Sequence, residues 1–303
     1  MSSSPNFSVL VKNFLDYLQN QCHYSSHTIQ NYRRDLRDFD AFTNHEMGDL
    51  NSLGKRTCQQ YLYALETQQY AHRSIHRKIA SLRSFWRYLI QGKHVDSNPW
   101  QLISLPKKPK RLPKVLSTKV MGRFLDALPE QTPRQIRDKC ICELLFASGV
   151  RVSELVGLDL ADIDLANQQC HVTGKGNKER ICLFGPEAAA ATQAYIDHAR
   201  PLWAQAQTQA LLINPNGQRL STRSIQRIIK AAGQQLGLDP DITPHSFRHS
   251  FATALLDGGA DLKSIQTLLG HESISATELY THLSMSALKD GYDKAHPRQK
   301  SDL

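Results

Sequence analysis

Residues Leu144–Leu155 read LLFASGVRVSEL, and this stretch joins a predicted helix end to a candidate functional arginine. A helix is predicted over residues 134–148, and Gly149 is its expected C-cap because glycine adopts left-handed backbone without strain. The turn would place the guanidinium of Arg151 at the junction of two helices, where Glu154 can orient it through a hydrogen bond. Taken alone, the two residues are better explained as a structural Arg–Glu pair.

A small antiparallel hairpin is predicted next. Apolar and polar residues alternate over residues 169–173 and 178–183, on either side of a glycine-containing turn at residues 174–177. A third strand is expected near residues 160–163. Lys175 lies in the turn, where it can reach into a groove and donate a proton to a leaving 5′ oxygen. The alternative is an ordinary exposed turn lysine.

A capped helix is predicted over residues 244–257. Thr243 can cap it, and Pro244 suits the first helical position. His245 and Arg248 are three residues apart, so they share one face of the first turn, and a helix N-terminus already attracts phosphate. The pair can therefore hold one anion, although the motif by itself also fits a satisfied surface helix.

Two further candidates follow a predicted helix end at Gly270. His271 would lie at that corner and can donate to a phosphate oxygen, and Ser273 can cap the next helix. Tyr280 lies on that helix, and its phenol, with an ordinary pKa of about 10, needs nearby cations or a base to act as a nucleophile. Burial in the core is the commoner use of such a histidine or tyrosine. Two other histidines are assigned to packing or supporting contacts: His249 and His282.

The remaining pattern from residue 116 onward is helical. Helices are predicted over residues 117–128, 186–203, 221–236, 261–269 and 273–283, with a short helix at about 284–291. The tail from Tyr292 is expected to be polar.

The first 105 residues predict helices only. Amphipathic periodicity indicates helices from about residue 7 to 18, from Ser25–His27 to about Phe42, over Lys55–Glu66 and over Arg73–Gln91. The last of these carries bases and no acid on its polar face, which favours a phosphate backbone as partner over a merely solvated surface. These bases are Arg73, Arg77, Lys78, Arg83 and Arg87.

A basic, proline-rich linker is predicted between the two regions. Residues 104–114 hold three prolines and five bases, among them Lys107 and Lys108. Proline favours extended chain, so this stretch can track a DNA backbone, although a plain solvated tether is the alternative. The expected division is a helical DNA-binding domain over 1–105, the linker over 106–115 and a second domain over 116–303.

The charge suggests a polyanionic partner, although many basic proteins bind none. The net charge is +9, and residues 1–110 carry fifteen Lys/Arg against eight Asp/Glu, so 15 − 8 = +7 of it lies there. The sequence shows neither a run long enough to span a membrane nor a secretory signal, so a cytoplasmic protein without membrane insertion is expected. The six scattered cysteines lack zinc spacing and are expected to be reduced thiols.

Together these motifs resemble a known family. Their order and wording are similar to those of the tyrosine recombinases (phage integrase family), and to the bacterial Xer subgroup almost end to end. The stretches that carry the resemblance are LLFASGVRVSEL at 144–155, GKGNKER at 174–180, HSFRHSFAT at 245–253, LLGH at 268–271 and YTH at 280–282. The ending AHPR at 295–298 looks more like XerC than XerD. The run SATEL at 275–279 departs from the family's usual wording but changes no candidate residue.

The resemblance implies a mainly α fold. It would comprise an N-terminal four-helix SAM-like core-binding domain and a C-terminal, mostly α catalytic domain with a small antiparallel β-sheet. It also implies roles: Tyr280 attacks the scissile phosphate to form a 3′-phosphotyrosyl link, and Lys175 is the general acid. Arg151, His245 and Arg248 would stabilise the transition state, assisted by His271, with Glu154 behind them. No metal, ATP or other cofactor would be needed.

The resemblance further implies partners. They are a double-stranded, dif-like DNA site, a XerD-like recombinase in a heterotetramer and a septal DNA translocase, in the resolution of chromosome dimers on the nucleoid. A phage or transposon integrase shares the catalytic set, and a relaxing topoisomerase shares the chemistry. A non-catalytic basic DNA-binding protein explains the charge but not the constellation of residues.

Overall fold

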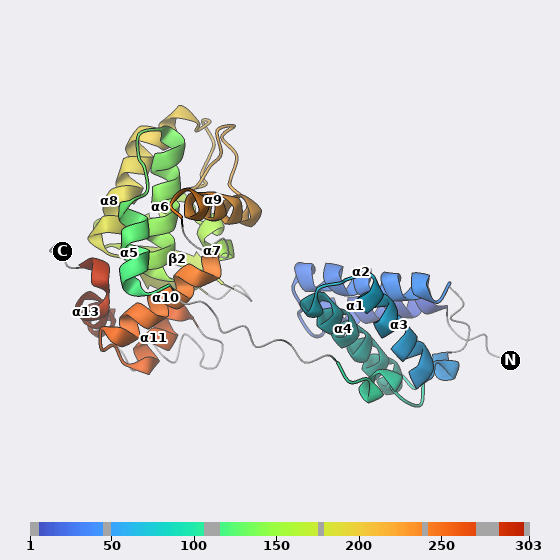
Figure 1. The fold of residues 1–303 in the computed structure, drawn as a ribbon. Helices are drawn as coiled ribbons and strands as arrows, with labels where there is room; N and C mark the ends of the chain where they lie inside the picture. Colours follow the sequence, from blue (N-terminus) through green and yellow to red (C-terminus); the bar gives the residue numbers. More distant parts are fainter. Residues whose placement is uncertain are drawn as a thin grey trace. The chain divides into compact units, whose positions relative to one another are not determined.

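The computed structural model describes residues 6–44, 50–105, 116–174, 179–237, 242–270 and 285–299. The chain divides into two compact units, Met1–Leu112 and Pro113–Leu303, each with its own hydrophobic core (Figure 1). Helices dominate both, and the predicted fold class is confirmed. The expected linker, residues 106–115, lies outside the described residues, so its extent stays a prediction, as do contacts of Lys107 and Lys108.

The first unit is a four-helix domain, and all four predicted helices are present. Its helices are α1 (Phe7–Asn20), α2 (Ser26–Phe42), α3 (Lys55–Thr67) and α4 (His72–Gln91), with short 3-10 turns η1 (Leu50–Ser52) and η2 (Pro99–Leu102). Ser25 caps α2 as expected, accepting from the backbone N–H of Thr28. Large aromatic rings meet edge to face in the core, with Phe39 5.0 Å from both Tyr61 and Trp100.

The basic face of α4 differs from the expectation because α2 supplies acids to it. Lys78 is only 2% exposed, and its Nζ donates to Asp38 at 2.5 Å and lies 3.6 Å from Asp35. Arg77 also pairs with Asp35. The face has no acid of its own, but the sequence of one helix cannot show acids that a neighbouring helix contributes.

Arg83 of the same helix makes structural contacts. Its Nε donates to the carbonyl of Trp100 at 3.0 Å and its Nη2 to that of Ile103 at 2.6 Å, so it holds the chain that leaves η2. Arg73 and Arg87 are exposed. Of the four arginines expected to bind DNA, these two have the most accessible side chains.

The second unit is built on a buried central helix, α6. The helices are α5 (Thr118–Asp126), α6 (Pro133–Ser148), α7 (Val152–Gly157), α8 (Pro186–Ala194), α9 (Thr222–Gln235), α10 (Pro244–Asp257), α11 (Leu262–Leu269) and α13 (Met285–Ala295). Nine successive residues of α6, Cys140–Ser148, are buried, because α5, α8 and α10 all pack against this helix. The predicted helix at 273–283 lies outside the described residues.

The predicted helix over 186–203 is broken into three pieces. α8 continues as a π-helical turn, η4 (Tyr195–Ala199), and a 3-10 turn, η5 (Arg200–Leu202). Pro201 explains the break, because it lacks an N–H and its ring clashes with the carbonyl four residues earlier. Pro201 therefore already indicates in the sequence that this helix ends before residue 203.

The sheet has three antiparallel strands in the order β1-β2-β3. The hairpin strands β2 (Gln169–Thr173) and β3 (Glu179–Leu183) are where the alternation placed them. The third strand, expected at 160–163, is only β1 (Ile163–Asp164), preceded by the 3-10 turn η3 (Leu160–Asp162). The apolar residues at 160–163 fit a 3-10 turn as well as a strand, so the sequence pattern could not distinguish the two.

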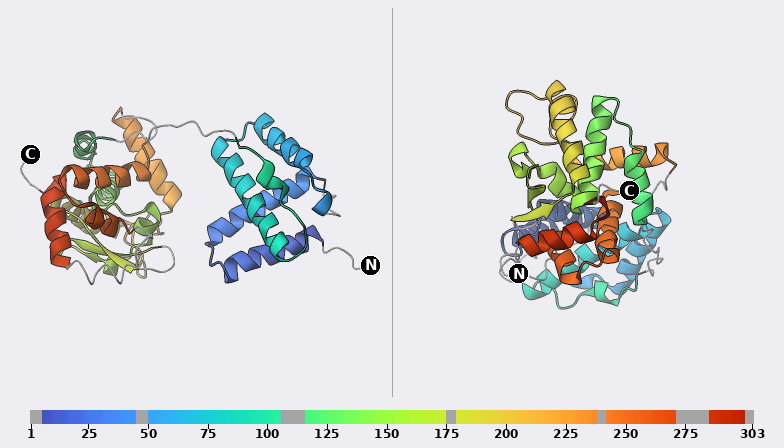
Figure 2. Two further views of the ribbon diagram at one scale, coloured as in Figure 1. Left: turned by 90° about the horizontal axis from the view of Figure 1, so that it is seen from below. Right: turned by 90° about the vertical axis from the view of Figure 1, so that its left-hand side faces the viewer.

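The expectation of a polar tail from Tyr292 is wrong. α13 runs to Ala295 and packs on α10, followed by the turn η6 (Pro297–Gln299) (Figure 2). Tyr292 is buried and donates to the carbonyl of Ala147 at 2.8 Å, and its ring stacks on that of His296 with centroids 4.9 Å apart. Arg298 then pairs with Glu143 of α6 at 2.8 Å. Tyr292 and His296 are buried, and Tyr292 and Arg298 find hydrogen-bond partners on α6, far away in sequence.

Two negative findings complete the fold. No helix in the described ranges is long and apolar enough to cross a membrane. All six cysteines are free, and five of them are buried.

Candidate active site

Arg151 projects from the junction that its sequence predicts. Gly149 ends α6 in the left-handed conformation, with φ +59°, and Arg151 is the N-cap of α7. The ring of Phe251 packs so closely on Gly149 that a Cβ there would lie 2.3 Å from it. The glycine therefore both permits the turn and lets α10 approach it. The Arg151 side chain is 38% exposed and accessible to a ligand.

Glu154 is the buried centre of the site's hydrogen bonding. It accepts from Arg151 twice, from Nη1 at 2.7 Å and from the backbone N–H at 2.8 Å. Arg180 of β3 binds the same carboxylate with both Nη atoms, at 2.9 and 2.8 Å. Burial alone would raise the pKa of Glu154, but the hydrogen bonds and charges of Arg180 and Arg151 lower it to about 2. The carboxylate is therefore ionised at neutral pH and fixes both arginines.

Arg248 approaches the same point from α10. Thr243 caps that helix and Pro244 begins it, as predicted. Arg248 donates from Nη1 to the carbonyl of Gly149 and from Nη2 to that of Leu269, both at 2.5 Å. Burial, followed by the charges of Arg151 and Arg180, lowers the pKa of Arg248 to about 10. The guanidinium is thus still charged at neutral pH but is held among like charges.

The arginines converge on the corner that ends α11. Gly270 has φ +63°, and its carbonyl accepts from Nη2 of Arg151 at 3.2 Å, beside the Leu269 carbonyl held by Arg248. Arg151, Arg180 and Arg248 lie around the single carboxylate of Glu154. Together the four side chains carry a net charge of +2. Such a cluster of planar, preorganised cations is suited to bind a phosphate group.

The structure places the other predicted residues unequally. His245 is exposed on the first turn of α10, one turn before Arg248. The positions of Lys175, His271 and Tyr280 lie outside the described residues, as does that of His282. In the ranges that are described, no group of His, Cys, Asp or Glu is arranged to hold a metal ion.

Arg180 belongs to this cluster, although no role was predicted for it from the sequence. It occupies a buried position of β3, in alternation with Cys182, where an apolar residue is expected. An arginine on the buried face of a strand needs an acidic partner. That signal pointed to an ion pair, although the sequence could not show that Glu154 completes it.

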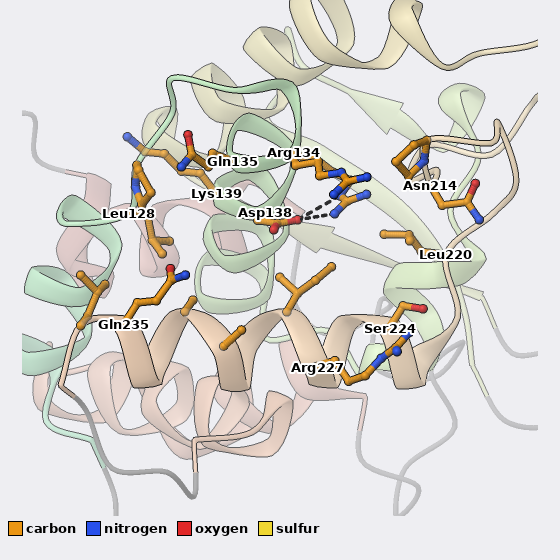
Figure 3. A pocket seen from close by; sticks show the side chains of 17 residues that line it. Leu128, Arg134, Gln135, Asp138, Lys139, Asn214, Leu220, Ser224, Arg227 and Gln235 are labelled. Carbon is orange, nitrogen blue, oxygen red and sulfur yellow. Dashed lines mark hydrogen bonds and ion pairs between the residues drawn. The ribbon is translucent and has the colours of Figure 1, made fainter.

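A separate groove of about 480 Å³ lies between α6 and α9 and shares no residue with the arginine cluster (Figure 3). Arg137 in its wall pairs with Asp138 at 2.7 Å and donates to the carbonyl of Ile213 at 3.3 Å. The Arg137 guanidinium also stacks over the ring of Trp203. The guanidinium of Arg137 in this groove is therefore occupied by structural contacts.

Comparison with known families matches both units. Residues 114–287, more than half of the chain, match the phage integrase family, and residues 11–93 match the phage integrase N-terminal SAM-like domain. These two matches cover the arginine cluster and the four-helix unit respectively.

Several curated proteins are similar over nearly their whole length. A tyrosine recombinase XerC of Pelobacter propionicus is 41% identical over 96% of this chain and 96% of the relative. A XerC of Halalkalibacterium halodurans is 40% identical over 95% of this chain and 97% of its own, and a XerD of the same organism is 37% identical over the same shares.

Solved structures share the fold. The Tn1549 transposon integrase in complex with transposon right end DNA has a TM-score of 0.69 at 19% identity, covering 94% of this chain and 98% of its own. The XerH recombinase bound to a palindromic difH substrate has a TM-score of 0.66 at 20% identity, covering 88% and 79%. At these identities the likeness is one of fold alone.

Proposed function

The chain belongs to the phage integrase family of tyrosine recombinases, enzymes that cut and rejoin DNA, and we propose that it is a site-specific recombinase of the Xer type. The observation that carries the proposal is the convergence of Arg151 and Arg248 on the carbonyls of residues 269 and 270. This cationic corner directly precedes His271 in the chain, and Tyr280 follows nine residues later.

In the proposed reaction Tyr280 is the nucleophile. Its phenol gives up its proton to a nearby base as its oxygen attacks the scissile phosphorus, the bond from phosphorus to the 5′ oxygen breaks, and a 3′-phosphotyrosyl link forms. Lys175 donates the proton that the leaving 5′ oxygen takes up. The protein–phosphate bond conserves the phosphodiester, so attack by a 5′ hydroxyl can rejoin the strand without ATP or a metal.

The arginines would stabilise the charge that builds on the non-bridging oxygens. Arg151 and Arg248 are both held by fixed partners, so little reorganisation is needed when the charge develops. His245 lies on the helix turn before Arg248 and would donate to the same phosphate, with His271 as a second donor. Glu154 would contact no substrate but would orient Arg151.

DNA binding by the first unit is part of the proposal. The bases assigned to the DNA backbone are Arg73, Arg77, Arg83, Arg87, Lys107 and Lys108. Arg73 and Arg87 are exposed, which supports the assignment for them. Arg77 and Arg83 already bind groups of the protein, the Asp35 carboxylate and the Trp100 carbonyl respectively. The excess of seven positive charges in residues 1–110 suits a polyanion.

The biological role follows from the relatives. Similarity to XerC and XerD proteins over nearly full length supports a role in resolving chromosome dimers during segregation at cell division, on the nucleoid in the cytoplasm. The target would be a dif-like site and the partner a XerD-like recombinase in a heterotetramer, with a septal DNA translocase acting on the complex. The higher identities to XerC support that place for this chain.

A nicked suicide substrate tests the chemistry. It carries a candidate recombination site, and cleavage releases a short strand so that the protein stays bonded to DNA after denaturation. We expect an adduct from the wild type and none from Tyr280→Phe, with DNA binding retained in both. Tyr292→Phe is the matched control, because it removes a phenol that donates inside the core, and it should still form the adduct.

The proposal fails if no candidate site gives an adduct, or if Tyr280→Phe forms one as fast as the wild type. Absence of an adduct together with tight, salt-sensitive binding would instead favour the non-catalytic DNA-binding protein.

A further inference from the structure

Arg180 is the buried member of the arginine cluster and has little access to a substrate. It is 8% exposed, and both of its Nη atoms donate to Glu154. Its Nε is buried as well. The N–H groups that Arg180 directs at Glu154 are not available to a phosphate at the exposed edge of Arg151, and little of the remaining side chain is exposed. Any effect of Arg180 on the reaction must pass through its neighbours.

The first neighbour is Glu154, which Arg180 and Arg151 share. A carboxylate has a limited set of lone pairs, and here Oε1 accepts from Arg180 at 2.9 Å and from Arg151 at 2.7 Å. Oε2 accepts from Arg180 and from the backbone N–H of Arg151, both at 2.8 Å. The bidentate bond from Arg180 therefore fixes the plane of the carboxylate, and that plane fixes the direction of the Arg151 guanidinium.

The second neighbour is the corner at Gly270. A Cβ on Gly270 would lie 2.9 Å from both Cδ and Nε of Arg180, so the glycine backbone rests directly on this side chain. The carbonyls of Leu269 and Gly270 accept from Arg248 and Arg151. One buried side chain thus supports both ends of the Arg151–Gly270 contact.

We propose that Arg180 is a positioning residue for DNA cleavage: through Glu154 and the Gly270 backbone it holds Arg151 and the corner before His271 in one geometry. The inference rests on the proposed recombinase function, because its readout is the cleavage rate. It does not make Arg180 a phosphate ligand. Lysine cannot replace it, because a point charge makes no two-pronged bond to a carboxylate.

Single-turnover cleavage separates positioning from folding. With the suicide substrate in excess and saturating, each protomer reacts only once, so the amplitude of adduct formation reports the fraction of folded protein, and the first-order rate constant reports the geometry of the site. Misplacement of a catalytic group by about 1 Å lowers a rate by roughly 100-fold. We expect Arg180→Lys to lower the rate constant about 10- to 100-fold, with DNA affinity within about 3-fold of the wild type.

Arg200→Lys is the matched control. Arg200 is also an arginine of this unit that is 8% exposed, and it donates to the carbonyls of Thr208, Ala210 and Leu211, none of which belongs to the cluster. Its replacement disturbs buried hydrogen bonds to a comparable degree. We expect a lower melting temperature and a lower amplitude at elevated temperature, but an unchanged rate constant.

Glu154→Gln completes a double-mutant cycle. If Arg180 acts through the Glu154 carboxylate, adding Arg180→Lys to Glu154→Gln lowers the rate constant by much less than it does in the wild type. If Arg180→Lys does not fold, Glu154→Gln alone still tests the route through the carboxylate, because it should lower the rate constant while Arg200→Lys does not.

Two results would overturn the inference: equal rate constants for Arg180→Lys and the wild type, or full additivity of the two substitutions. If the wild type itself forms no adduct with any site, the recombinase proposal fails instead. The two failures are therefore distinguishable.

Discussion

At the residue scale, the site depends on carbonyl oxygens as much as on charged side chains. Arg248 is held by the carbonyls of Gly149 and Leu269, and Arg151 by that of Gly270. Both glycines have positive φ, at the ends of α6 and α11. Two helix ends thus present unpaired carbonyls to two arginines, which satisfies the carbonyls and aligns the cations.

Gly270→Ala should therefore damage the site more than a comparable change elsewhere. Left-handed backbone costs an alanine about 1–2 kcal/mol, and the new Cβ would also lie 2.9 Å from Arg180. We expect a loss of stability above that range and a fall of about 10-fold or more in the first-order cleavage rate. Chemical unfolding and single-turnover cleavage measure the two effects.

Gly259→Ala is the control that measures only the cost of left-handed backbone for an alanine. Gly259 also has positive φ, but a Cβ there would meet nothing within 4 Å. Its variant should lose about 1–2 kcal/mol and cleave at the normal rate. Equal behaviour of the two variants would show that contact with Arg180 is unimportant.

Much of this site was predictable because its signals are local. Caps and turns at Gly149, Thr243 and Gly270 depend on the residue itself and its near neighbours, and they placed Arg151 and Arg248 correctly. The role of Arg180 was not predictable, because it depends on an acid 26 residues away in sequence. The roles of Lys175, His271 and Tyr280 rest on the family pattern, and adduct formation is the experiment that tests the role of Tyr280.

At the element scale, α4 separates its arginines into exposed and structural ones. Arg87 is exposed, whereas Arg83 donates to the carbonyls of Trp100 and Ile103. The sequence of α4 alone shows a single basic face. It does not show that acids of α2 and carbonyls at η2 bind some of these bases.

Arg87→Ala and Arg83→Ala should therefore differ in kind. Each phosphate contact contributes about 0.9 to the slope of log K against log salt, so Arg87→Ala should reduce that slope by about 0.9 at an unchanged melting temperature. Arg83→Ala should lower the melting temperature, because it removes two hydrogen bonds to carbonyls of the chain leaving η2. Binding titrations across salt concentrations would contradict this assignment if the slope for Arg87→Ala stayed at the wild-type value.

The packing of α13 and η6 predicts a dependence of stability on pH. Burial lowers the pKa of His296 to about 3, from an ordinary value near 6.5, so the folded state keeps it neutral. The unfolded state takes up a proton as the pH falls below about 6.5, and stability is lost by up to about 1.4 kcal/mol per pH unit. His296→Phe should remove this loss, since its ring fits among Phe146, Phe251 and Tyr292.

The difference between variant and wild type isolates this effect. Burial raises the pKa of Glu143 to about 7, so protonation of Glu143 stabilises the folded state as the pH falls from about 7 towards 4.5, with the opposite sign. Denaturant unfolding at several pH values between 7 and 5 measures the difference. A constant difference over this range would show that His296 is not held neutral.

At the scale of the whole molecule, two cores stand in one chain. One is formed by residues of α1–α4 and η2, and the other surrounds α6, with a smaller cluster under α13. The sequence predicted both units from their periodicities, because each is built mainly from helices close together along the chain. It missed the return of the C-terminal residues to α6, which is a contact over 155 residues.

Limited proteolysis tests the expected linker over 106–115. Trypsin needs an accessible Lys or Arg, and the units bury much of their remaining backbone, so we expect the first cut between Lys107 and Lys114. Mass spectrometry of the two fragments locates it. A first cut inside either unit, with residues 107–114 intact, would contradict the predicted boundaries.

In the proposed reaction one tyrosine, Tyr280, becomes bonded to DNA. The tryptic peptide of residues 264–289 contains no other tyrosine, so fragmentation of this peptide assigns the bonded residue. Adducts formed on a suicide substrate are digested with nuclease and trypsin and sequenced by mass spectrometry. We expect a nucleotide on Tyr280 of this peptide, and a nucleotide on any other residue would show that Tyr280 is not the nucleophile.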